Sequence, residues 1–132
     1  SNEIRTFNTL HQPIKVEEKT DYKQITTKEL ITSSYVLKPQ ELVLGMTLET
    51  ITLPHFICGL LNSRSRFARL GIMVHITAPF MQPGISNRQV LEIYNAGPNN
   101  LELIPGERVC QFIFQRCDGE ARYQGQFKSQ EL

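Results

Sequence analysis

The sequence predicts an all-β domain, with its strands closed into a barrel or stacked as sheets so that few strand edges stay open. From Tyr35 onward, short runs rich in Val, Ile, Leu, Thr and Phe alternate with turns that contain Pro or Gly, and no helical period of useful length competes with them. A chain of 132 residues with 40% hydrophobic and 20% charged residues suits one domain with a buried core. We therefore expect a single β unit over residues 1–132.

The predicted strands follow one another along the chain with turns between them. Residues 7–35 are polar and mixed in charge, which is typical of surface excursions between short strands. The run "LVLGMTLETITL" (42–53) alternates apolar and polar side chains, with one break near Thr50 that indicates a β-bulge. Further strands are expected in "IMVHIT" (72–77), "QVLEIYN" (89–95), "LELI" (101–104) and "VCQFIF" (109–114). Turns are expected in "APFMQPGIS" (78–86), "AGPNN" (96–100) and "PGE" (105–107).

The stretch "NSRSRFARLG" is the exception to the strand pattern. Ser65 can cap one or two helical turns that run through Arg69, and Gly71 can end them. Such a helix start presents a hydroxyl, unpaired backbone N–H groups and a positive dipole end, all of which suit a phosphate group. Two more arginines flank the serine, Arg64 and Arg66. Forked guanidinium groups match phosphate oxygens, but a surface loop with solvated arginines accounts for the same composition.

Glu92 stands inside an otherwise apolar strand pattern. By the alternation of a strand it shares a face with Val90 and Tyr94. Burial there disfavours the charged form and raises the pKa of the carboxyl toward working pH, which suits a general base. A structural ion pair with an arginine is an equal alternative. The lone histidine of a neighbouring predicted strand, His75, is expected to be a satisfied core residue.

Charge and cysteine content exclude several classes of function. Fourteen basic and thirteen acidic residues give a formal net charge of +1, so we expect neither nucleic acid nor a membrane as partner. The three cysteines, Cys58, Cys110 and Cys117, are too irregular for a disulfide framework and show no zinc motif. We interpret them as buried free thiols, which favours a cytoplasmic protein. The tail, residues 120–132, is either frayed or a segment that closes over a ligand.

A longer segment, "SRSRFARLGIMVHITAPFMQPGISNRQVLEIYNAGPNNLELIPGERVCQFIF", resembles the core of the dCTP deaminases, a branch of the trimeric dUTPase superfamily. That family carries an Arg-Ser-Ser-x-Ala-Arg-x-Gly element, an Ile-Asp-Pro-Gly turn, a Leu-Glu-x-Tyr-Asn strand and a Pro-Gly-x-x-Ile/Val strand opening, in this order. The resemblance spans about residues 36–115, and "ARYQGQ" matches the closing segment of the family more loosely. It implies a dUTPase-like β-barrel or distorted jelly roll with one short helix, a homotrimer, and a full-length chain with a further N-terminal portion.

The resemblance also implies an activity, the zinc-independent deamination of dCTP to dUTP and ammonia. Glu92 takes the place of the proton shuttle, and Ser65 and Arg69 place the water and stabilise the transition state. His75 and Ala78 match the strand and the turn that line the pocket, and the Ala78 carbonyl helps to hold the water. The implied partners are dCTP-, dUTP- or dTTP-type nucleotides and two more copies of the chain, with active sites between subunits. The implied cofactor is Mg²⁺ carried by the triphosphate. The implied nucleotide- and phosphate-binding residues are Arg64, Ser65, Arg66, Arg69, Gln82, Val90, Arg122, Tyr123 and Gln126.

Three positions depart from the family pattern. Arg66 replaces the second serine, Gln82 replaces the turn aspartate, and Arg122 replaces a lysine of the closing segment. Two alternatives therefore stay open beside the deaminase. One is a bifunctional enzyme that forms dUMP from dCTP, and the other is a trimeric nucleotide-binding protein with impaired catalysis.

Overall fold

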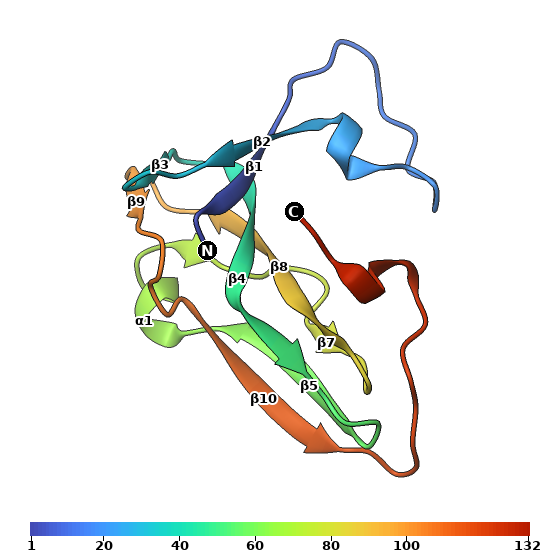
Figure 1. Cartoon of the computed structure of the whole chain (residues 1–132). Coiled ribbons are helices and arrows are strands. Elements are labelled where there is room, and N and C mark those ends of the chain that lie inside the picture. Colours follow the sequence, from blue (N-terminus) through green and yellow to red (C-terminus); the bar gives the residue numbers. More distant parts are fainter.

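The computed structural model describes all 132 residues except the side chain of Gln126, and it is built mainly from strands (Figure 1). The strands are β1 (Glu3–Phe7), β2 (Thr26–Leu30), β3 (Tyr35–Leu37), β4 (Leu42–Thr52), β5 (Ile57–Ser63), β6 (Ile72–Met73), β7 (Phe80–Met81), β8 (Ser86–Asn95), β9 (Leu101–Leu103) and β10 (Cys110–Arg116). The helices are α1 (Ser65–Ala68) and the 3-10 turns η1 (Tyr22–Gln24) and η2 (Gln126–Ser129). The predicted all-β fold with one short helix is confirmed.

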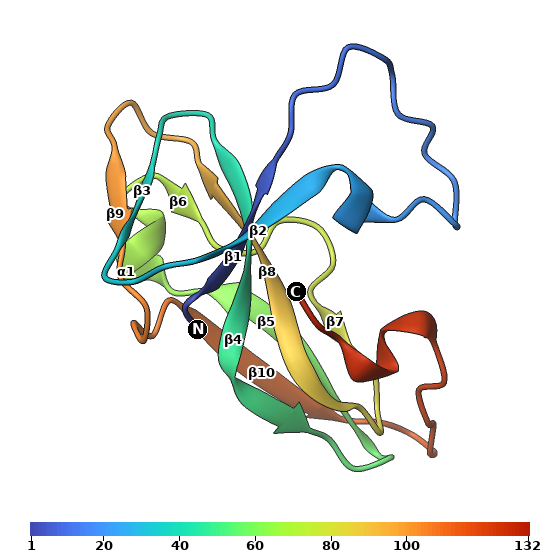
Figure 2. The ribbon, with the colours of Figure 1, turned by 45° about the horizontal axis from the view of Figure 1, so that its top comes forward.

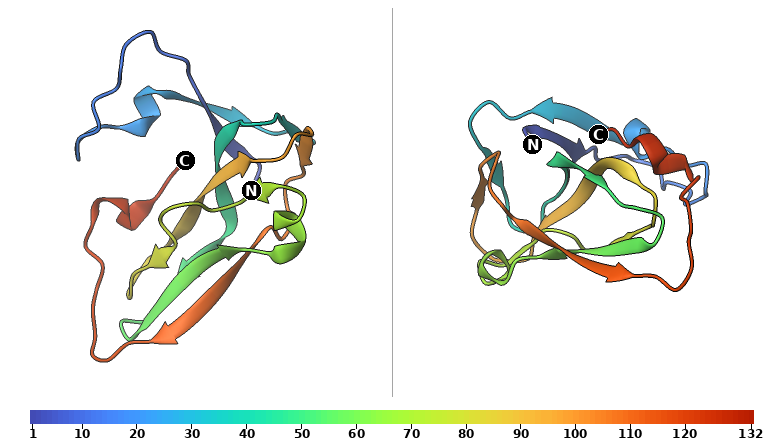
Figure 3. Two further views of the ribbon diagram at one scale, coloured as in Figure 1. Left: turned by 180° about the vertical axis from the view of Figure 1, so that it is seen from behind. Right: turned by 60° about the horizontal axis from the view of Figure 1, so that its bottom comes forward.

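The strands form three antiparallel sheets. The largest has the order β2-β1-β4-β8-β6, a second has the order β10-β5-β7, and β3 pairs with β9. Figures 2 and 3 show β4 and β8 on one side of the body and β5 and β10 on the other. The segment between β1 and η1 projects away from this body in both figures.

The core lies between the two larger sheets because each contributes apolar side chains on one face. Directly opposed residues of a ladder point to the same face, so the pair Val43 and Ile93 shares the inner face of the five-stranded sheet. Leu61 of β5 packs against them from the opposing sheet, and all three are at most 8% exposed. Each fully buried side chain of this size contributes about 1.5–3 kcal/mol to stability.

The outer face of the same sheet carries a different set of residues. Arg5 of β1 is opposite Leu44 of β4, and Leu44 is opposite Glu92 of β8. The three side chains therefore lie in one row on the outer face. The C-terminal segment, residues 121–132, crosses this face, with η2 packed along β8 (Figure 3).

Some predicted strand boundaries are confirmed and others are wrong. The register of β4 against β8 shifts between Met46 and Thr50, where the broken alternation predicted a bulge. The expected strand 72–77 stops at Met73, because backbone N–H groups beyond it donate to a carboxylate of β8 instead of to a ladder. The predicted turn 78–86 contains β7, which pairs with β5, and its last residue already belongs to β8.

The short helix forms where it was expected, but its start differs. Arg64, not Ser65, takes the N-cap position, because its extended backbone (φ −87°, ψ 135°) precedes a Ser65 that is already helical. Its carbonyl accepts the N–H groups of Phe67 and Ala68, and no side chain caps the helix. Gly71 ends the turn as predicted, with φ of +86° in the left-handed region that favours glycine.

The three cysteines are free, but they are half-buried and not buried as predicted. Cys110 begins β10 and Cys117 follows it, and β10 is an edge strand whose outer side has no neighbouring strand in its sheet. None of the helices in the described part of the chain has the length and apolar composition that crossing a bilayer requires.

Candidate functional site

A cavity of about 280 Å³ opens on the outer face of the five-stranded sheet. Five of the residues proposed from the sequence line it together: Ala78, Gln82, Val90, Glu92 and Tyr123. They come from β8, from the two loops that flank β7, and from the C-terminal segment. The fold therefore brings residues that are up to 45 positions apart in the chain to one cavity.

The Glu92 carboxylate is held by hydrogen bonds at one wall of this cavity. Its Oε2 accepts the backbone N–H groups of Ile76 at 3.0 Å and Thr77 at 2.8 Å, and its Oε1 accepts the Thr77 hydroxyl at 2.7 Å. Burial acts to raise the pKa of Glu92, but these hydrogen bonds favour the ionised form and lower the pKa overall. The burial expected from the strand pattern predicted a raised pKa for Glu92. That expectation is wrong because strand periodicity shows the burial of a carboxylate and not the donors that a neighbouring loop aims at it.

The remaining walls combine flat apolar surface with amide groups. Leu44 and Val90 supply apolar surface from the sheet, while Asn87 and Gln89 supply amides, joined by a 2.6 Å hydrogen bond from Gln89 Nε2 to Asn87 Oδ1. Apolar walls with a few placed polar groups are typical of sites for small planar ligands. An ionised carboxylate at such a wall can accept a proton from a bound water or ligand.

His75 lines this cavity, as the resemblance implied, so the expectation of a satisfied core residue, which rested on its being a lone strand histidine, is wrong. Its two ring nitrogens are covered and have no hydrogen-bond partner among the described residues. The reason is that β6 ends at Met73, which frees the following residues from the strand alternation. His75 then faces the same cavity as Glu92 and acts electrostatically to lower the pKa of that carboxyl.

The arginine cluster lies elsewhere on the chain. Arg64, Ser65 and Arg66 line a separate depression of about 370 Å³ that has no lining residue in common with the Glu92 cavity. Figures 1 and 2 show α1 and η2 on opposite sides of the molecule. Arg69 follows α1 and lines neither hollow. One chain therefore does not bring Ser65 and Arg69 to Glu92.

Two other residues were proposed from the C-terminal segment, Arg122 and Gln126. Arg122 is exposed and packs against Gly84, whose added Cβ would lie 3.3 Å from the Arg122 Cα, and it does not line the cavity. The side chain of Gln126 lies outside the described residues.

Among the further lining residues that were not predicted from the sequence are Tyr22, Phe127 and Gln130. Phe127 and Gln130 belong to the tail, where an aromatic side chain in a polar segment was the available signal. Tyr22 belongs to the polar region 7–35, to which charge patterning assigned no role. Only the folding of η1 toward the outer face of the sheet places its ring in the cavity.

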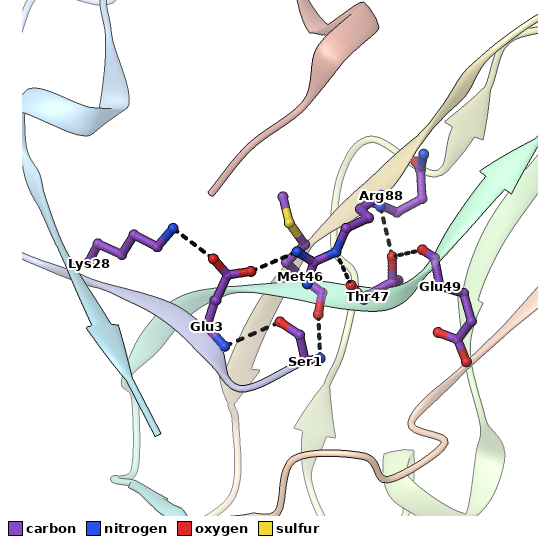
Figure 4. A network of polar contacts seen from close by, with 8 residues as sticks. Ser1, Glu3, Lys28, Met46, Thr47, Glu49 and Arg88 are labelled. Atoms are coloured by element: carbon purple, nitrogen blue, oxygen red, sulfur yellow. Dashed lines mark hydrogen bonds and ion pairs between the residues drawn. The ribbon is translucent and has the colours of Figure 1, made fainter. Parts of the chain in front are cut away.

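An ion-pair network fixes the sheet beside the cavity (Figure 4). Glu3 of β1 accepts Lys28 Nζ and an Arg88 guanidinium N–H, each at 2.7 Å. Arg88 also donates its Nε–H to the Thr47 carbonyl at 2.7 Å, so one side chain of β8 joins β1 and β4. Hydrogen bonds from Lys28 and Arg88 lower the pKa of Glu3. The network positions the start of β8, on which the cavity residues stand.

The substitution Thr77→Val tests the hydrogen bonds that hold Glu92. Removal of the hydroxyl donor will raise the pKa of Glu92, since two backbone donors then remain against the same burial. A lowered pKa in the folded protein adds stability that is present above the unfolded-state pKa and is lost as pH falls through the folded-state pKa. Carbon-13 NMR titration of Glu92 will therefore show a higher midpoint in the variant. The loss of stability on acidification will begin at the same pH, which the unfolded-state pKa sets, but it will be smaller and complete at a higher pH.

Thr27→Val is the matched control for this titration. Its hydroxyl donates to Asn8 Oδ1 at 2.9 Å, outside the cavity. An unchanged Glu92 midpoint in Thr77→Val, or an equal shift in Thr27→Val, would contradict the assigned cause.

Comparison with known proteins identifies one family and solved structures with a similar fold. A model of the dCTP deaminase-like family matches residues 1–117. A dCTP deaminase of Tolumonas auensis is 44% identical over 103 residues, which cover 74% of this chain and 53% of the relative. A dCTP deaminase of Shewanella amazonensis is 46% identical over 87 residues, which cover 66% and 45%. The chain thus spans about half the length of these relatives.

Solved structures show the same architecture. The crystal structure of the 2′-deoxycytidine 5′-triphosphate deaminase from Agrobacterium tumefaciens matches with a TM-score of 0.75 at 17% identity, over 89% of this chain and 36% of that chain. The EIAV dUTPase matches with a TM-score of 0.57 at 18% identity, over 73% and 79%. The predicted dUTPase-like fold is confirmed.

Proposed function

Because this chain belongs to the dCTP deaminase-like family, we propose that it forms the catalytic core of an enzyme that converts dCTP and water to dUTP and ammonia. The observation that carries the proposal is the Glu92 carboxylate, held ionised at the wall of a cavity that Ala78, Gln82 and Val90 also line. The cavity has the apolar walls and amide groups that a pyrimidine ring requires.

The reaction moves two protons from the water, and one carboxylate can take up and deliver both of them. Glu92 takes a proton from the attacking water and passes it to N3 of the cytosine ring. The new C4–O bond then forms a tetrahedral centre, and the second proton of the water moves through Glu92 to the amino group. The C4–N bond breaks and ammonia leaves. A lowered pKa favours each donation step, because the protonated carboxyl is then a stronger acid.

Hydrogen bonds orient the water in this proposal. The sequence lacks the His-x-Glu…Pro-Cys-x-x-Cys signature of zinc deaminases. We assign the water to the Ala78 carbonyl and the Ser65 hydroxyl, and the developing charge to Arg69. Mg²⁺ would be bound by the triphosphate, since phosphate oxygens and waters are its usual ligands. The guanidinium groups of Arg64 and Arg66 would neutralise the remaining negative charge of the triphosphate.

A homotrimer with sites between subunits is part of the proposal. It is supported by the separation of the two hollows within one chain, since a nucleotide that touches Glu92 must receive Arg69 from a neighbouring copy. It is also supported by an exposed apolar row that runs across β7, β5 and β10 at Phe80, Leu60 and Ile113, with exposures of 51%, 40% and 49%. We place the enzyme in the cytoplasm, where free thiols stay reduced.

Mixing two inactive variants tests the shared site. Glu92→Gln and Arg69→Ala chains, each without deaminase activity, are unfolded and refolded together in equal amounts with dCTP and Mg²⁺. Sites that combine two chains will recover about a quarter of the wild-type rate of ammonia release, since one pairing in four has both intact residues. No recovery would contradict sites between subunits.

Product analysis of the wild-type protein separates the remaining functions. We expect dUTP. Release of dUMP would instead identify the bifunctional enzyme. Binding of dCTP without turnover would identify a nucleotide-binding protein. The latter is the second candidate, because Gln82 replaces the carboxylate of the turn.

A further inference from the structure

The polar N-terminal region contributes one aromatic residue to the cavity, Tyr22. The turn that carries it is well held. Asp21 caps η1 by accepting the Lys23 N–H at 3.0 Å, and the Thr26 hydroxyl donates to the Tyr22 carbonyl at 2.9 Å. The first contact holds the start of η1, and the second attaches η1 to the first residue of β2, so the position of the Tyr22 backbone follows that of the sheet.

The guanidinium group of Arg5 packs against one face of the Tyr22 ring. Its guanidinium carbon lies 5.9 Å from the ring centroid, and its terminal nitrogen donates to the Thr26 hydroxyl at 3.2 Å. Arg5 is only 9% exposed and, among the described residues, forms no ion pair with a carboxylate. A buried guanidinium with no acidic partner is costly, so the aromatic face and the Thr26 oxygens are the groups that stabilise its charge.

The hydroxyl of Tyr22 reaches across to the end of the chain. It donates to the Glu131 carbonyl at 3.0 Å. Two further side chains hold the same segment on β8: Asn87 donates to the Phe127 carbonyl at 2.8 Å, and Gln130 donates to the Arg88 carbonyl at 2.9 Å. Figures 1 and 3 show η1 and η2 on the same side of the molecule, with the chain end between them.

We infer that Tyr22 is a positioning residue of the nucleotide site, which clamps the C-terminal segment over the cavity through its hydroxyl while Arg5 sets the place of its ring. This inference rests on the proposed function, because that function identifies the ligand as dCTP. The C-terminal segment supplies Phe127 and Gln130 to the cavity, so its closure determines how long a nucleotide stays there. Tyr22 therefore acts on nucleotide retention and not on the proton transfers at Glu92.

The substitution Tyr22→Phe tests the clamp, since it removes the hydroxyl and keeps the ring over Arg5. We expect the backbone amides of residues 126–132 to exchange with deuterium about fivefold faster, as the loss of one hydrogen bond of about 1 kcal/mol implies. We also expect the KM for dCTP to rise by a similar factor while kcat stays within twofold. Unchanged exchange in residues 126–132 would overturn the inference.

Tyr35→Phe is the matched control, because it removes a tyrosine hydroxyl that donates to Glu41 at 2.6 Å, away from the cavity. It must leave the exchange of residues 126–132 and the KM unchanged, and an equal effect would show that general loosening is the cause. If the wild-type protein does not turn over dCTP, the proposed function fails, but the exchange measurement still decides the clamp.

A second pair of variants tests the part played by Arg5. Arg5→Met removes the charge and keeps most of the bulk, so the ring of Tyr22 loses its cationic partner and exchange in residues 126–132 rises. Arg5→Lys keeps the charge and must restore part of the protection. Equal exchange in both variants would overturn the role of the Arg5 charge.

Discussion

For the proposed deamination, we expect Glu92→Gln to lower the turnover of dCTP by about a thousandfold, within the usual range for removal of a general acid–base group. Glutamine has nearly the same shape, and its carbonyl oxygen can still accept the Thr77 hydroxyl, but the amide cannot take up and return a proton. The loss will appear in kcat, since the proton transfers occur in the transition state. Ammonia release from dCTP with Mg²⁺ measures it.

Glu102→Gln is the matched control for that measurement. Glu102 is an exposed strand glutamate that also accepts a hydroxyl, from Ser34, but lies outside the cavity. It will keep wild-type turnover. A Glu92→Gln protein that retained turnover within tenfold of wild type while binding dCTP normally would end the role assigned to Glu92.

Asn95→Ala will destabilise the fold by about 3 kcal/mol, because it leaves several buried polar groups without partners. The Asn95 side chain has no exposed surface and donates to the carbonyls of Leu37 at 3.1 Å and Asn99 at 2.7 Å. Its Oδ1 accepts the Gly97 N–H at 3.0 Å. Alanine removes all three hydrogen bonds and opens a small cavity. Urea unfolding will show a lower midpoint with an unchanged slope.

Asn62→Ala supplies the comparison for this stability effect. Asn62 is exposed, and its side chain accepts only the N–H of the next residue, Ser63, at 2.9 Å. Its replacement will change the free energy of unfolding by less than about 0.5 kcal/mol. A loss below about 1 kcal/mol in Asn95→Ala would show that the Asn95 amide does not hold the end of β3 to the loop that follows β8.

The sequence predicted much of the five-stranded sheet and the part of the site that lies around Glu92. Alternation along 42–53 predicted β4 with its bulge, and alternation along 89–95 put Glu92 on the face of β8 opposite to that of Leu91 and Ile93, which the structure shows to be the core face. Such predictions succeed because side-chain direction in a strand depends only on the parity of position. The resemblance of motifs then named Ala78, Gln82 and Tyr123, which the structure brings to the Glu92 cavity.

The electrostatic state of that site was not predictable in the same way. Ile76 and Thr77 were expected to continue a strand, and instead they donate to Glu92 and lower its pKa. A pKa depends on which donors lie within hydrogen-bond distance in three dimensions, and periodicity carries no information about a loop that bends toward a strand 15 residues later. His75 was misplaced for the same reason, since it follows the residue at which β6 stops.

Local residue patterns alone determined the all-β class, the short helix before Gly71 and the face of its strand on which Glu92 lies. Each of these depends on neighbours within a few positions, such as alternating side chains or a glycine that accepts a left-handed backbone. Long-range contacts decided the rest. Contacts with Arg5 and Glu131 hold Tyr22 at the cavity, and the packing of the sheets places the arginine cluster on the other side of the core. These placements follow from the packing of sheets and segments far apart in the chain, which no local pattern encodes.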